Sequence, residues 1–393
     1  MTAGDKKRNI CVITATYPID GEYGGIFVHD YCKMLINCGN EVTVLYAKGT
    51  RSLNALRNHK ELDRFSMDGV QVYRDLSLRF ADTYTVALTR ASIIKSCRRL
   101  YERYAADEGK PDLLVSHFSY PAGIGAAFIS AEYGIPLVSV EHLSLFTNPL
   151  ARPWMNPSLV EVINQSKRFV CVSEGLKEGI IKRTDTKHMI DVIPDMISDR
   201  YSYFPRKHDS PNGKFVFLSV GSLIKRKNHK ALIEAFTKAF RGNPDVVLRI
   251  IGTGPLEDAL RKKIVRLEME EQIILAGAFN GNALLEEYIG CDCFVLLSLN
   301  ETFGIVYREA LAVGRPVISS KHKGIVNGWE DCFGILVDAQ NEDNTVNALR
   351  EMYADISKYN NHYLAGKMHE MYSSESIGNR YNKLFDEVLI EKR

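Results

Sequence analysis

The chain has 393 residues, more than one ordinary hydrophobic core holds, so its length predicts two domains of similar size. Its 50 basic and 48 acidic residues give a formal net charge of +2, which excludes a dedicated nucleic-acid binder with a marked basic excess. The sequence has no run of about 18 uncharged apolar residues, and a charged start leads straight into a strand pattern. We therefore expect neither a transmembrane helix nor a secretory signal, and a cytoplasmic protein.

The eight cysteines do not form a metal-binding pattern. Cys11, Cys171 and Cys293 lie inside apolar strand patterns, where a reduced thiol behaves as a small hydrophobe. Cys291-Asp-Cys293 lacks the two-residue gap and the second ligand pair of a zinc site. We interpret all eight as structural.

The first half of the chain alternates apolar strands with helical patterns. The predicted strands are Ile10 to Thr14, Val42 to Tyr46, Leu113 to Ser116, Leu137 to Val140 and Phe169 to Val172. Helical patterns such as Phe27 to Leu35 and Ala122 to Ala131 lie between them. Continuous Val, Ile and Leu runs separated by helices indicate a parallel sheet covered on both faces.

Two features of this half are candidate site elements. Gly24 and Gly25 lie in the loop between the first strand and a helix, a geometry that lets the backbone approach a phosphate or sugar; the alternative is a simple tight turn. His142 ends a later strand and so faces the cleft side, although a lone histidine there is more often structural. His117 ends an earlier strand and is the weaker candidate.

Residues 84–106 predict a basic amphipathic helix. The segment carries Arg90, Lys95, Arg98, Arg99 and Arg103 against the single acid Glu102, with apolar residues between them. Such a helix can rest on an anionic membrane at the inner face of the plasma membrane. It is equally well explained as an ordinary surface helix that packs its apolar face inward.

The second half repeats the alternation after a polar linker. Its predicted strands are Phe215 to Val220, Val246 to Ile251, Ile273 to Leu275, Cys293 to Leu297 and Pro316 to Ser319. The proline-punctuated stretch before them has no period and predicts a linker. We place the first domain at 1–203, the linker at 204–213 and the second domain at 214–374.

Two loops follow the first strands of the second domain. Gly221 to Asn228 contains Lys225, Arg226 and Lys227, cations at a strand's carboxyl end that suit an anion. Gly252-Thr-Gly254-Pro255 superficially resembles a dinucleotide fingerprint, but the third glycine is missing. A helix-start turn with proline at the first helical position explains that second loop equally well.

Glu301 and Glu309 bracket the most informative stretch, which reads as strand, loop, helix, strand. The loop Thr302-Phe303-Gly304 then lies at the carboxyl end of a parallel sheet, and the helix after it directs unpaired N–H groups at the crevice. A diphosphate suits that position, and the two carboxylates can accept hydrogen bonds from hydroxyls on either side of it. Two glutamates at this spacing are common by chance, so the surrounding elements carry the prediction.

These residues resemble the signature of the retaining glycosyltransferases of family 4, two glutamates with seven residues between them, written around Glu-x-Phe-Gly. Glu301, Phe303, Gly304, Glu309 and Ala310 all match it. The resemblance implies an α/β protein of the GT-B fold, with two doubly wound Rossmann-like domains that face each other across a cleft. It also implies that 375–393 forms a final helix that returns to the first domain.

The resemblance further implies roles for individual residues. The first glutamate and the backbone after it hold the donor hexose, and the second glutamate binds the nucleotide ribose. In the family an arginine and a lysine neutralise the diphosphate. The family lysine corresponds to Lys227, but Ser222 occupies the position of the family arginine. Arg226 or Lys225 would then have to take over the role of that arginine. A family histidine near the reacting sugar falls on His142.

We therefore predict Glu301, His142 and Lys227 as catalytic residues. The predicted donor-binding residues are Gly24, Gly25, Gly221, Arg226, Lys227, Gly252, Phe303, Gly304, Ile305 and Glu309. The sequence has no Asp-x-Asp, so we expect no metal and no cofactor, with leaving-group charge met by the cations and the helix start.

The predicted function is transfer of a hexose, with retention, from a UDP- or GDP-sugar to a glycan or lipid-linked acceptor. By the resemblance, we expect a role in cell-surface polysaccharide or glycolipid biosynthesis. Three alternatives remain open: a GT-B sugar-nucleotide epimerase, an inactive nucleotide-sugar-binding protein, and, on the Gly252-x-Gly254 turn alone, a nicotinamide dehydrogenase.

Overall fold

The structure, a computed structural model, describes residues 7–19, 24–59, 62–79, 86–147, 151–205, 213–326 and 328–390. The chain forms two compact units, one of Met1–Asp195 with Ile377–Arg393 and the other of Met196–Ser376. We predicted that the first domain ends at residue 203, and in the structure the division of the sequence between the two units falls after Asp195. Residues 206–212 of the predicted linker lie outside the described residues.

The first unit is built on an eight-stranded sheet with the order β3-β4-β2-β1-β5-β6-β7-β8. Its strands are β1 (Asn9–Thr14), β2 (Glu41–Thr50), β3 (Asp63–Met67), β4 (Val70–Leu78), β5 (Leu113–His117), β6 (Leu137–Glu141), β7 (Arg168–Cys171) and β8 (Ile190–Val192). All neighbouring pairs are parallel except β3 with β4. The sequence analysis did not predict β3, β4 or β8.

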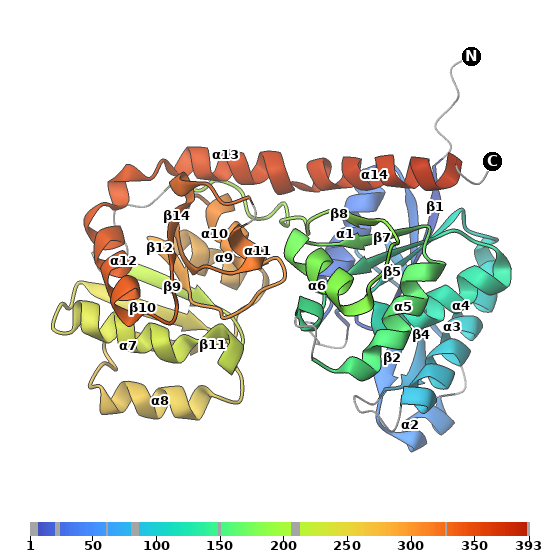
Figure 1. Ribbon diagram of the computed structural model, residues 1–393, viewed down its shortest axis with the longest axis horizontal. Helices are drawn as coiled ribbons and strands as arrows, with labels where there is room; N and C mark the ends of the chain where they lie inside the picture. The colour runs from blue at the N-terminus through green and yellow to red at the C-terminus, as the bar shows by residue number, and fades with distance from the viewer. Residues whose placement is uncertain are drawn as a thin grey trace, which may run out of the picture. The chain divides into compact units, whose positions relative to one another are not determined.

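Helices cover this sheet and include the end of the chain. They are α1 (Ile26–Asn37), α2 (Leu53–Asn58), α3 (Val86–Glu108), α4 (Ile124–Tyr133), α5 (Asn156–Gln165), α6 (Glu174–Thr184) and α14 (Ser374–Ile390). Helices α3, α4 and α5 lie side by side (Figure 1). Helix α14 packs on α1, where Tyr381 meets Tyr31 edge to face at 4.9 Å and Asn382 donates to the carbonyl of Cys38.

The second unit contains a six-stranded, fully parallel sheet with the order β11-β10-β9-β12-β13-β14. Its strands are β9 (Phe215–Val220), β10 (Val246–Ile251), β11 (Ile273–Gly277), β12 (Cys293–Leu296), β13 (Val317–Ser320) and β14 (Gly334–Val337). Its helices are α7 (His229–Phe240), α8 (Glu257–Arg266), α9 (Gly281–Gly290), α10 (Ile305–Ala312), α11 (Lys323–Val326), α12 (Glu342–Ala354) and α13 (Asn361–Tyr372). Helix α7 packs against α12, and α10 packs against α13.

The strand orders place the candidate loops. In the second sheet β10 lies on one side of β9 and β12 on the other, so the direction of winding reverses between β9 and β12. In the first sheet the same reversal occurs between β1 and β5. Ligands of open α/β sheets bind outside the carboxyl ends of the strands at such a reversal. The predicted α/β architecture of two doubly wound parallel sheets is confirmed.

Candidate active site

The loops after β9 and β12 meet at the reversal point of the second sheet. The N–H of Leu299, after β12, donates to the carbonyl of Arg226, after β9, at 2.8 Å. Because the two loops are joined through their backbones, side chains from positions 226 and 301 reach one another across the carboxyl edge of the sheet. Helix α10 begins just beyond, after Gly304.

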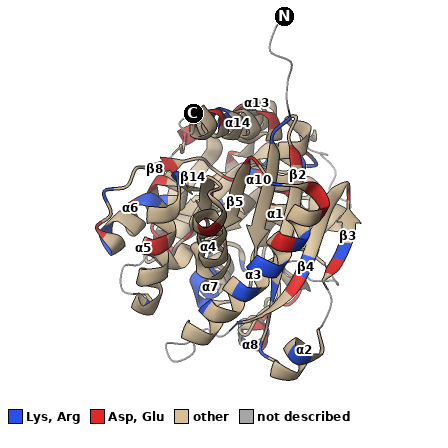
Figure 2. Cartoon of the chain, turned by 90° about the vertical axis from the view of Figure 1, so that its right-hand side faces the viewer, with Lys and Arg blue, Asp and Glu red and all other residues tan. Residues whose placement is uncertain are grey.

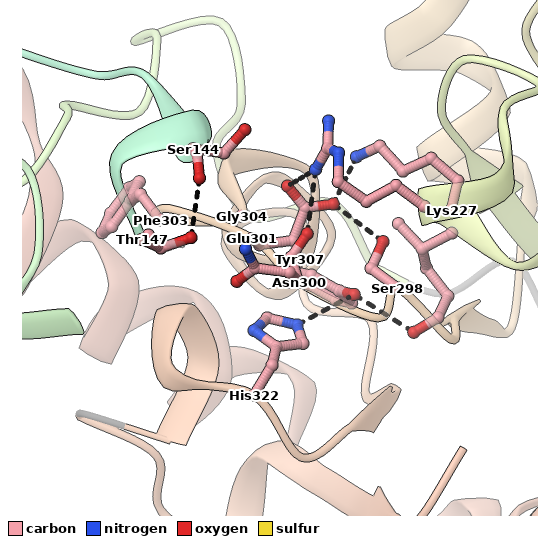
Figure 3. A network of polar contacts seen from close by, with 12 residues as sticks. Ser144, Thr147, Lys227, Ser298, Asn300, Glu301, Phe303, Gly304, Tyr307 and His322 are labelled. Atoms are coloured by element: carbon pink, nitrogen blue, oxygen red, sulfur yellow. Dashed lines mark hydrogen bonds and ion pairs between the residues drawn. The ribbon is translucent and has the colours of Figure 1, made fainter. Parts of the chain in front are cut away.

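Glu301 is the centre of this site. Its side chain is buried, with 7% of the residue exposed, and both oxygens have partners. Oε1 accepts from Lys227 Nζ at 2.5 Å and from Ser298 Oγ at 2.7 Å, and Oε2 accepts from Arg226 Nη1 at 2.8 Å. Figure 3 shows Glu301 between Lys227 and Ser298. The structure therefore brings together three predicted residues from two loops.

Electrostatics keep this carboxylate ionised. Burial alone raises the pKa of Glu301, but the neighbouring Lys227 and Arg226 cations and the hydrogen bonds outweigh burial, so its pKa lies below the ordinary value. Glu301 thus carries a negative charge near neutral pH and offsets part of the charge of the two cations predicted to bind the donor diphosphate. A diphosphate has to share these cations with Glu301 or take them from it.

Arg226 completes the cationic side of the site. Its guanidinium also donates to the carbonyl of Asn300 at 2.9 Å, and 35% of its side chain is exposed. Ser222, at the position where the resembled family carries arginine, is exposed. The structure thus places Arg226, rather than a residue at position 222, beside Lys227.

Glu309 lies apart from this ion-pair cluster. It extends from α10, half-buried, and accepts a hydrogen bond from the Tyr288 hydroxyl of α9 at 2.9 Å. Burial, and next the charge of Glu309, raise the pKa of Tyr288 well above its ordinary value, so the hydroxyl keeps its proton and remains a donor. Glu301 therefore pairs with Lys227 and Arg226, whereas Glu309 accepts from Tyr288.

Two residues of the turn before α10 have structural roles, Gly304 through its backbone conformation and Phe303 through its packing. Gly304 adopts φ +73°, and a Cβ there would come within 2.7 Å of the Tyr307 ring, so glycine is required. Phe303 is 4% exposed and its ring lies 3.8 Å below the Arg308 guanidinium. The Phe303 side chain therefore packs inside the unit, and its predicted contact with the donor stays a prediction. Ile305 opens α10, where backbone N–H groups are unpaired within the helix.

The remaining predicted glycines allow loops to pack closely. A Cβ on Gly252, at φ +143°, would lie 2.1 Å from the carbonyl oxygen of Gly221, and one on Gly254 would lie 2.7 Å from that of Leu223. A Cβ on Gly221 would contact the Lys227 side chain at 3.3 Å. These glycines bring the loop after β10 against the loop after β9 and so support the position of Lys227.

Family comparisons account for most of the chain. Residues 24–200 match the model described as Glycosyltransferase Family 4, and residues 202–367 match the model described as Glycosyl transferases group 1. The chain belongs to family 4 of the glycosyltransferases.

Several relatives of this glycosyltransferase have names that describe enzymes of glycoside synthesis. It is 25% identical to the alpha-monoglucosyldiacylglycerol synthase of Streptococcus pneumoniae over 71% of this chain and 67% of that protein. It is 24% identical to the D-inositol 3-phosphate glycosyltransferase of Pseudarthrobacter chlorophenolicus over 86% and 84%. Over a shorter stretch, 36% of this chain and 38% of the relative, it is 37% identical to a Campylobacter jejuni N-acetylgalactosaminyltransferase that acts on a diphospho-undecaprenol sugar.

Solved structures establish the GT-B fold of this glycosyltransferase. Sucrose-phosphate synthase from Thermosynechococcus elongatus superposes with a TM-score of 0.79 at 16% identity, covering 98% of this chain and 100% of that one. Anabaena HepE, solved in complex with UDP and glucose, gives 0.73 at 16% identity over 96% and 99%. At this level of identity the likeness concerns the fold alone.

The first unit of the glycosyltransferase holds His142 in an internal network. His142 Nε2 lies 2.9 Å from His117 Nδ1, and His142 Nδ1 lies 3.1 Å from Asp195 Oδ1. Both ring nitrogens thus face protein atoms, so a sugar has to replace or share one of these contacts. Glu141, next to His142, is fully buried, and its oxygens accept from the backbone N–H groups of Ser119, His142 and Leu143.

Gly24 and Gly25 begin the described part of the loop before α1. Gly25 has φ +87°, and a Cβ there would lie 2.7 Å from the backbone carbonyl of Thr16. A Cβ on Gly24 would lie 3.3 Å from the Thr16 hydroxyl. The close approach is therefore to the chain's own loop after β1, and residues 20–23 between them lie outside the described residues.

Helix α3 matches the predicted basic segment, of which residues 84 and 85 lie outside the described residues. Its apolar residues Ile93 and Leu100 are fully buried, and Figure 2 shows its basic positions beside acidic ones on α4 and α5. Arg90 holds Glu161 through two hydrogen bonds of 2.5 and 2.7 Å. Arg98, Arg99 and Arg103 pair with Glu132, Asp75 and Asp107.

These contacts favour the interpretation of α3 as an ordinary surface helix, and the helix carries no argument for membrane binding. Among the residues that the structure describes, no helix has both the length and the apolar character needed to cross a membrane.

Four site residues escaped the sequence analysis. Ser298 lies three positions before Glu301 in the same loop, so its hydroxyl was a detectable candidate. Tyr288, Tyr307 and His322 come from other segments, and no local pattern marks them. The Tyr307 hydroxyl donates to the Leu296 carbonyl at 3.1 Å and lies 3.4 Å from His322 Nε2. Burial lowers the pKa of His322 to about 4, so its ring is neutral near pH 7.

Proposed function

We propose that this glycosyltransferase moves a hexose from a UDP- or GDP-sugar to a glycan or lipid-linked acceptor. The observation that supports it most is the buried Glu301 carboxylate flanked by Lys227 and Arg226 at the reversal point of the second sheet. This arrangement provides two cations for a diphosphate and one carboxylate for sugar hydroxyls within a single site. The start of α10 adds unpaired backbone N–H groups beside them.

In the proposed reaction the leaving diphosphate gathers negative charge as the glycosidic bond breaks. Lys227, Arg226 and the start of α10 stabilise that charge, and Glu301 accepts hydrogen bonds from the transferred hexose. Glu309, oriented by Tyr288, binds the ribose, and His142 contacts the reacting sugar from the first unit. We assign no covalent nucleophile, and transfer proceeds with retention and without a metal.

The nature of the donor and acceptor draws support from the relatives. HepE was solved with UDP-glucose, so UDP-sugars are the first donors to test. The name of one bacterial relative contains a glucosylated diacylglycerol, and the name of another contains a sugar linked to diphospho-undecaprenol. These names favour a lipid-linked acceptor and a role in glycolipid or surface polysaccharide synthesis. An enzyme with such an acceptor has to meet a bilayer, and flotation with anionic liposomes at low salt tests that contact.

One assay tests the proposal. The purified protein is incubated with UDP- and GDP-sugars, with and without undecaprenyl-phosphate-linked sugars and diacylglycerol, and free nucleotide is measured. We expect nucleotide release that depends on acceptor, survives EDTA and gives a product with the donor's anomeric configuration. Donor conversion without acceptor would instead indicate an epimerase. No turnover of any donor by wild-type protein that binds UDP would indicate a binding protein.

A further inference from the structure

Three polar side chains form a continuous chain at the carboxyl edge of the first sheet. His117 is the last residue of β5, His142 follows β6, and Asp195 follows β8 at the end of the first unit. The Asp195 carboxylate lies 3.1 Å from His142 Nδ1, and His142 Nε2 lies 2.9 Å from His117 Nδ1. The sequence analysis assigned no role to Asp195.

The chemistry of the three groups gives this chain a direction. An ionised carboxylate can only accept, so the proton of a neutral His142 belongs on Nδ1, facing Asp195. Nε2 is then a lone pair and can only accept, so His117 must donate to it from Nδ1. Burial, and next the neighbouring His142, lower the pKa of His117 well below its ordinary value, which keeps that ring neutral.

In the part of the chain that the structure describes, no other carboxylate forms an ion pair with His142. Glu141 is adjacent in sequence, but its two oxygens are taken by three backbone N–H groups at 2.8 to 2.9 Å. The contact between His142 Nδ1 and Asp195 Oδ1 is an ion-pair contact at 3.1 Å that lacks hydrogen-bond geometry, and among the described residues Nδ1 has no hydrogen-bond partner, so the charge of Asp195 is what acts on this nitrogen. Asp195 is therefore the group that decides where the His142 proton lies.

Aromatic rings pack around the two histidines of this chain. The Phe27 and Phe118 rings lie 4.9 and 5.3 Å from the His142 ring, centroid to centroid, and Tyr31 meets His117 edge to face at 4.5 Å. Hydrogen bonds strengthen in such a low-dielectric environment, so the direction set at one end is carried to the other.

We infer that Asp195 is a positioning residue that holds the His142 proton on Nδ1 and, through His142, makes His117 a donor. A sugar hydroxyl that replaces His117 at His142 Nε2 then meets a lone pair, so the ring accepts a hydrogen bond from the hydroxyl there and cannot donate one. This use of the chain in transfer rests on the proposed function. The hydrogen-bond direction itself does not, and it can be measured without turnover.

Two-bond ¹H–¹⁵N NMR spectra of the imidazole rings at pH 7 show which ring nitrogen carries the proton. The variants His142→Gln and His117→Gln assign the signals of the two histidines. We expect wild-type His142 and His117 both as the Nδ1–H tautomer. Asp195→Ala should release the constraint, so that His142 shows Nε2–H. Asp195→Asn should keep Nδ1–H, because the amide oxygen still accepts. A wild-type His142 that is protonated on Nε2 or on both nitrogens overturns the inference, even if Asp195→Ala does not fold.

Kinetics then test the use of the chain. We expect Asp195→Ala to lower kcat by about tenfold or more with an unchanged KM for the donor, and Asp195→Asn to restore kcat. Asp191→Ala is the matched control, since Asp191 is 25% exposed against 26% for Asp195 and pairs with Arg168 rather than a histidine. Equal losses in Asp195→Asn and Asp195→Ala would overturn the positioning role. If no variant or wild type transfers sugar, the proposed function fails while the spectra still decide the hydrogen-bond direction.

Discussion

Replacing Glu301 with glutamine should tighten the binding of UDP while it abolishes most transfer. The two effects have opposite signs because Glu301 has two roles in the proposed reaction. Without donor, its charge occupies Lys227 at 2.5 Å and Arg226 at 2.8 Å. With donor, the same carboxylate is needed for the sugar. Glutamine keeps the shape of the side chain, removes its charge and turns one of its two acceptor oxygens into an NH2 donor.

The size of the gain follows from the geometry. A phosphate oxygen bound to Lys227 Nζ at hydrogen-bonding distance lies roughly 4 to 5 Å from the Glu301 carboxylate. Two like charges at about 4 Å repel by about 4 kcal/mol at an effective dielectric constant of about 20. Since 35% of the Arg226 side chain is exposed, solvent and side-chain movement absorb much of this repulsion. We expect a remainder of about 1.4 kcal/mol, or about tenfold tighter UDP binding.

Transfer should fall in the same variant. The carboxylate no longer accepts hydrogen bonds from the hexose as charge develops, a loss of about 2 to 4 kcal/mol of transition-state stabilisation. This loss corresponds to about 30- to 900-fold in kcat/KM. Isothermal titration with UDP and with uridine, and a nucleotide-release assay, measure the two effects separately. Uridine has no phosphate, so its affinity should not change.

Glu287→Gln is the matched control for this experiment. Glu287 also forms a close ion pair in the second unit, with Arg249 at 2.6 and 2.8 Å, and this partner differs from those of Glu301. We expect that variant to bind UDP as the wild type does. Weaker UDP binding in Glu301→Gln, with Glu287→Gln unaffected, would refute the reasoning, because it would show that Glu301 assists the diphosphate rather than competing with it.

Three further variants test other parts of the structure. Glu309→Gln should weaken uridine and UDP by the same factor, about tenfold, because both carry the ribose; a loss confined to UDP contradicts the ribose role. Gly252→Ala should lower the free energy of unfolding, measured in urea, by about 2 to 3 kcal/mol, because the new Cβ would lie 2.1 Å from the Gly221 carbonyl oxygen. Gly366→Ala is the control: a Cβ at position 366 has no atom within 4 Å, so this variant should be neutral or stabilising. Burial lowers the pKa of His229 to about 4, so as the pH falls below about 6.5 the unfolded chain binds a proton at this histidine before the folded chain does. The free energy of unfolding of the wild type should therefore fall by about 2 kcal/mol between pH 7 and pH 5 relative to that of His229→Leu. A difference between the two proteins that does not change with pH would contradict this.

The sequence predicted the elements that build the site better than their arrangement. The apolar runs of β9 and β12 are continuous enough to predict buried parallel strands, and both loops after them carry charged residues. Their adjacency depends on the strand order, which no local pattern contains. The close pairing of Lys227 with Glu301, 74 positions apart, therefore appeared only in the structure.

Short and edge strands were missed for a related reason. β3 alternates intermediate and exposed residues, so it has no apolar face to detect, and β8 is three residues long. β8 nevertheless positions a residue of the proposed network, because the segment after it brings Asp195 against His142. Phe303 matches the family motif and its ring packs beneath Arg308 inside the unit, so its contact with the donor stays a prediction. A motif position alone does not distinguish a ligand contact from packing.

A crystal structure with UDP tests the central claim most directly, since that claim places the donor diphosphate between Lys227, Arg226 and the start of α10. We predict phosphate oxygens within hydrogen-bonding distance of Lys227 Nζ and the Arg226 guanidinium, with the contact between Glu301 and Lys227 lengthened or broken. A diphosphate bound elsewhere, with that ion pair still at 2.5 Å, would contradict the claim.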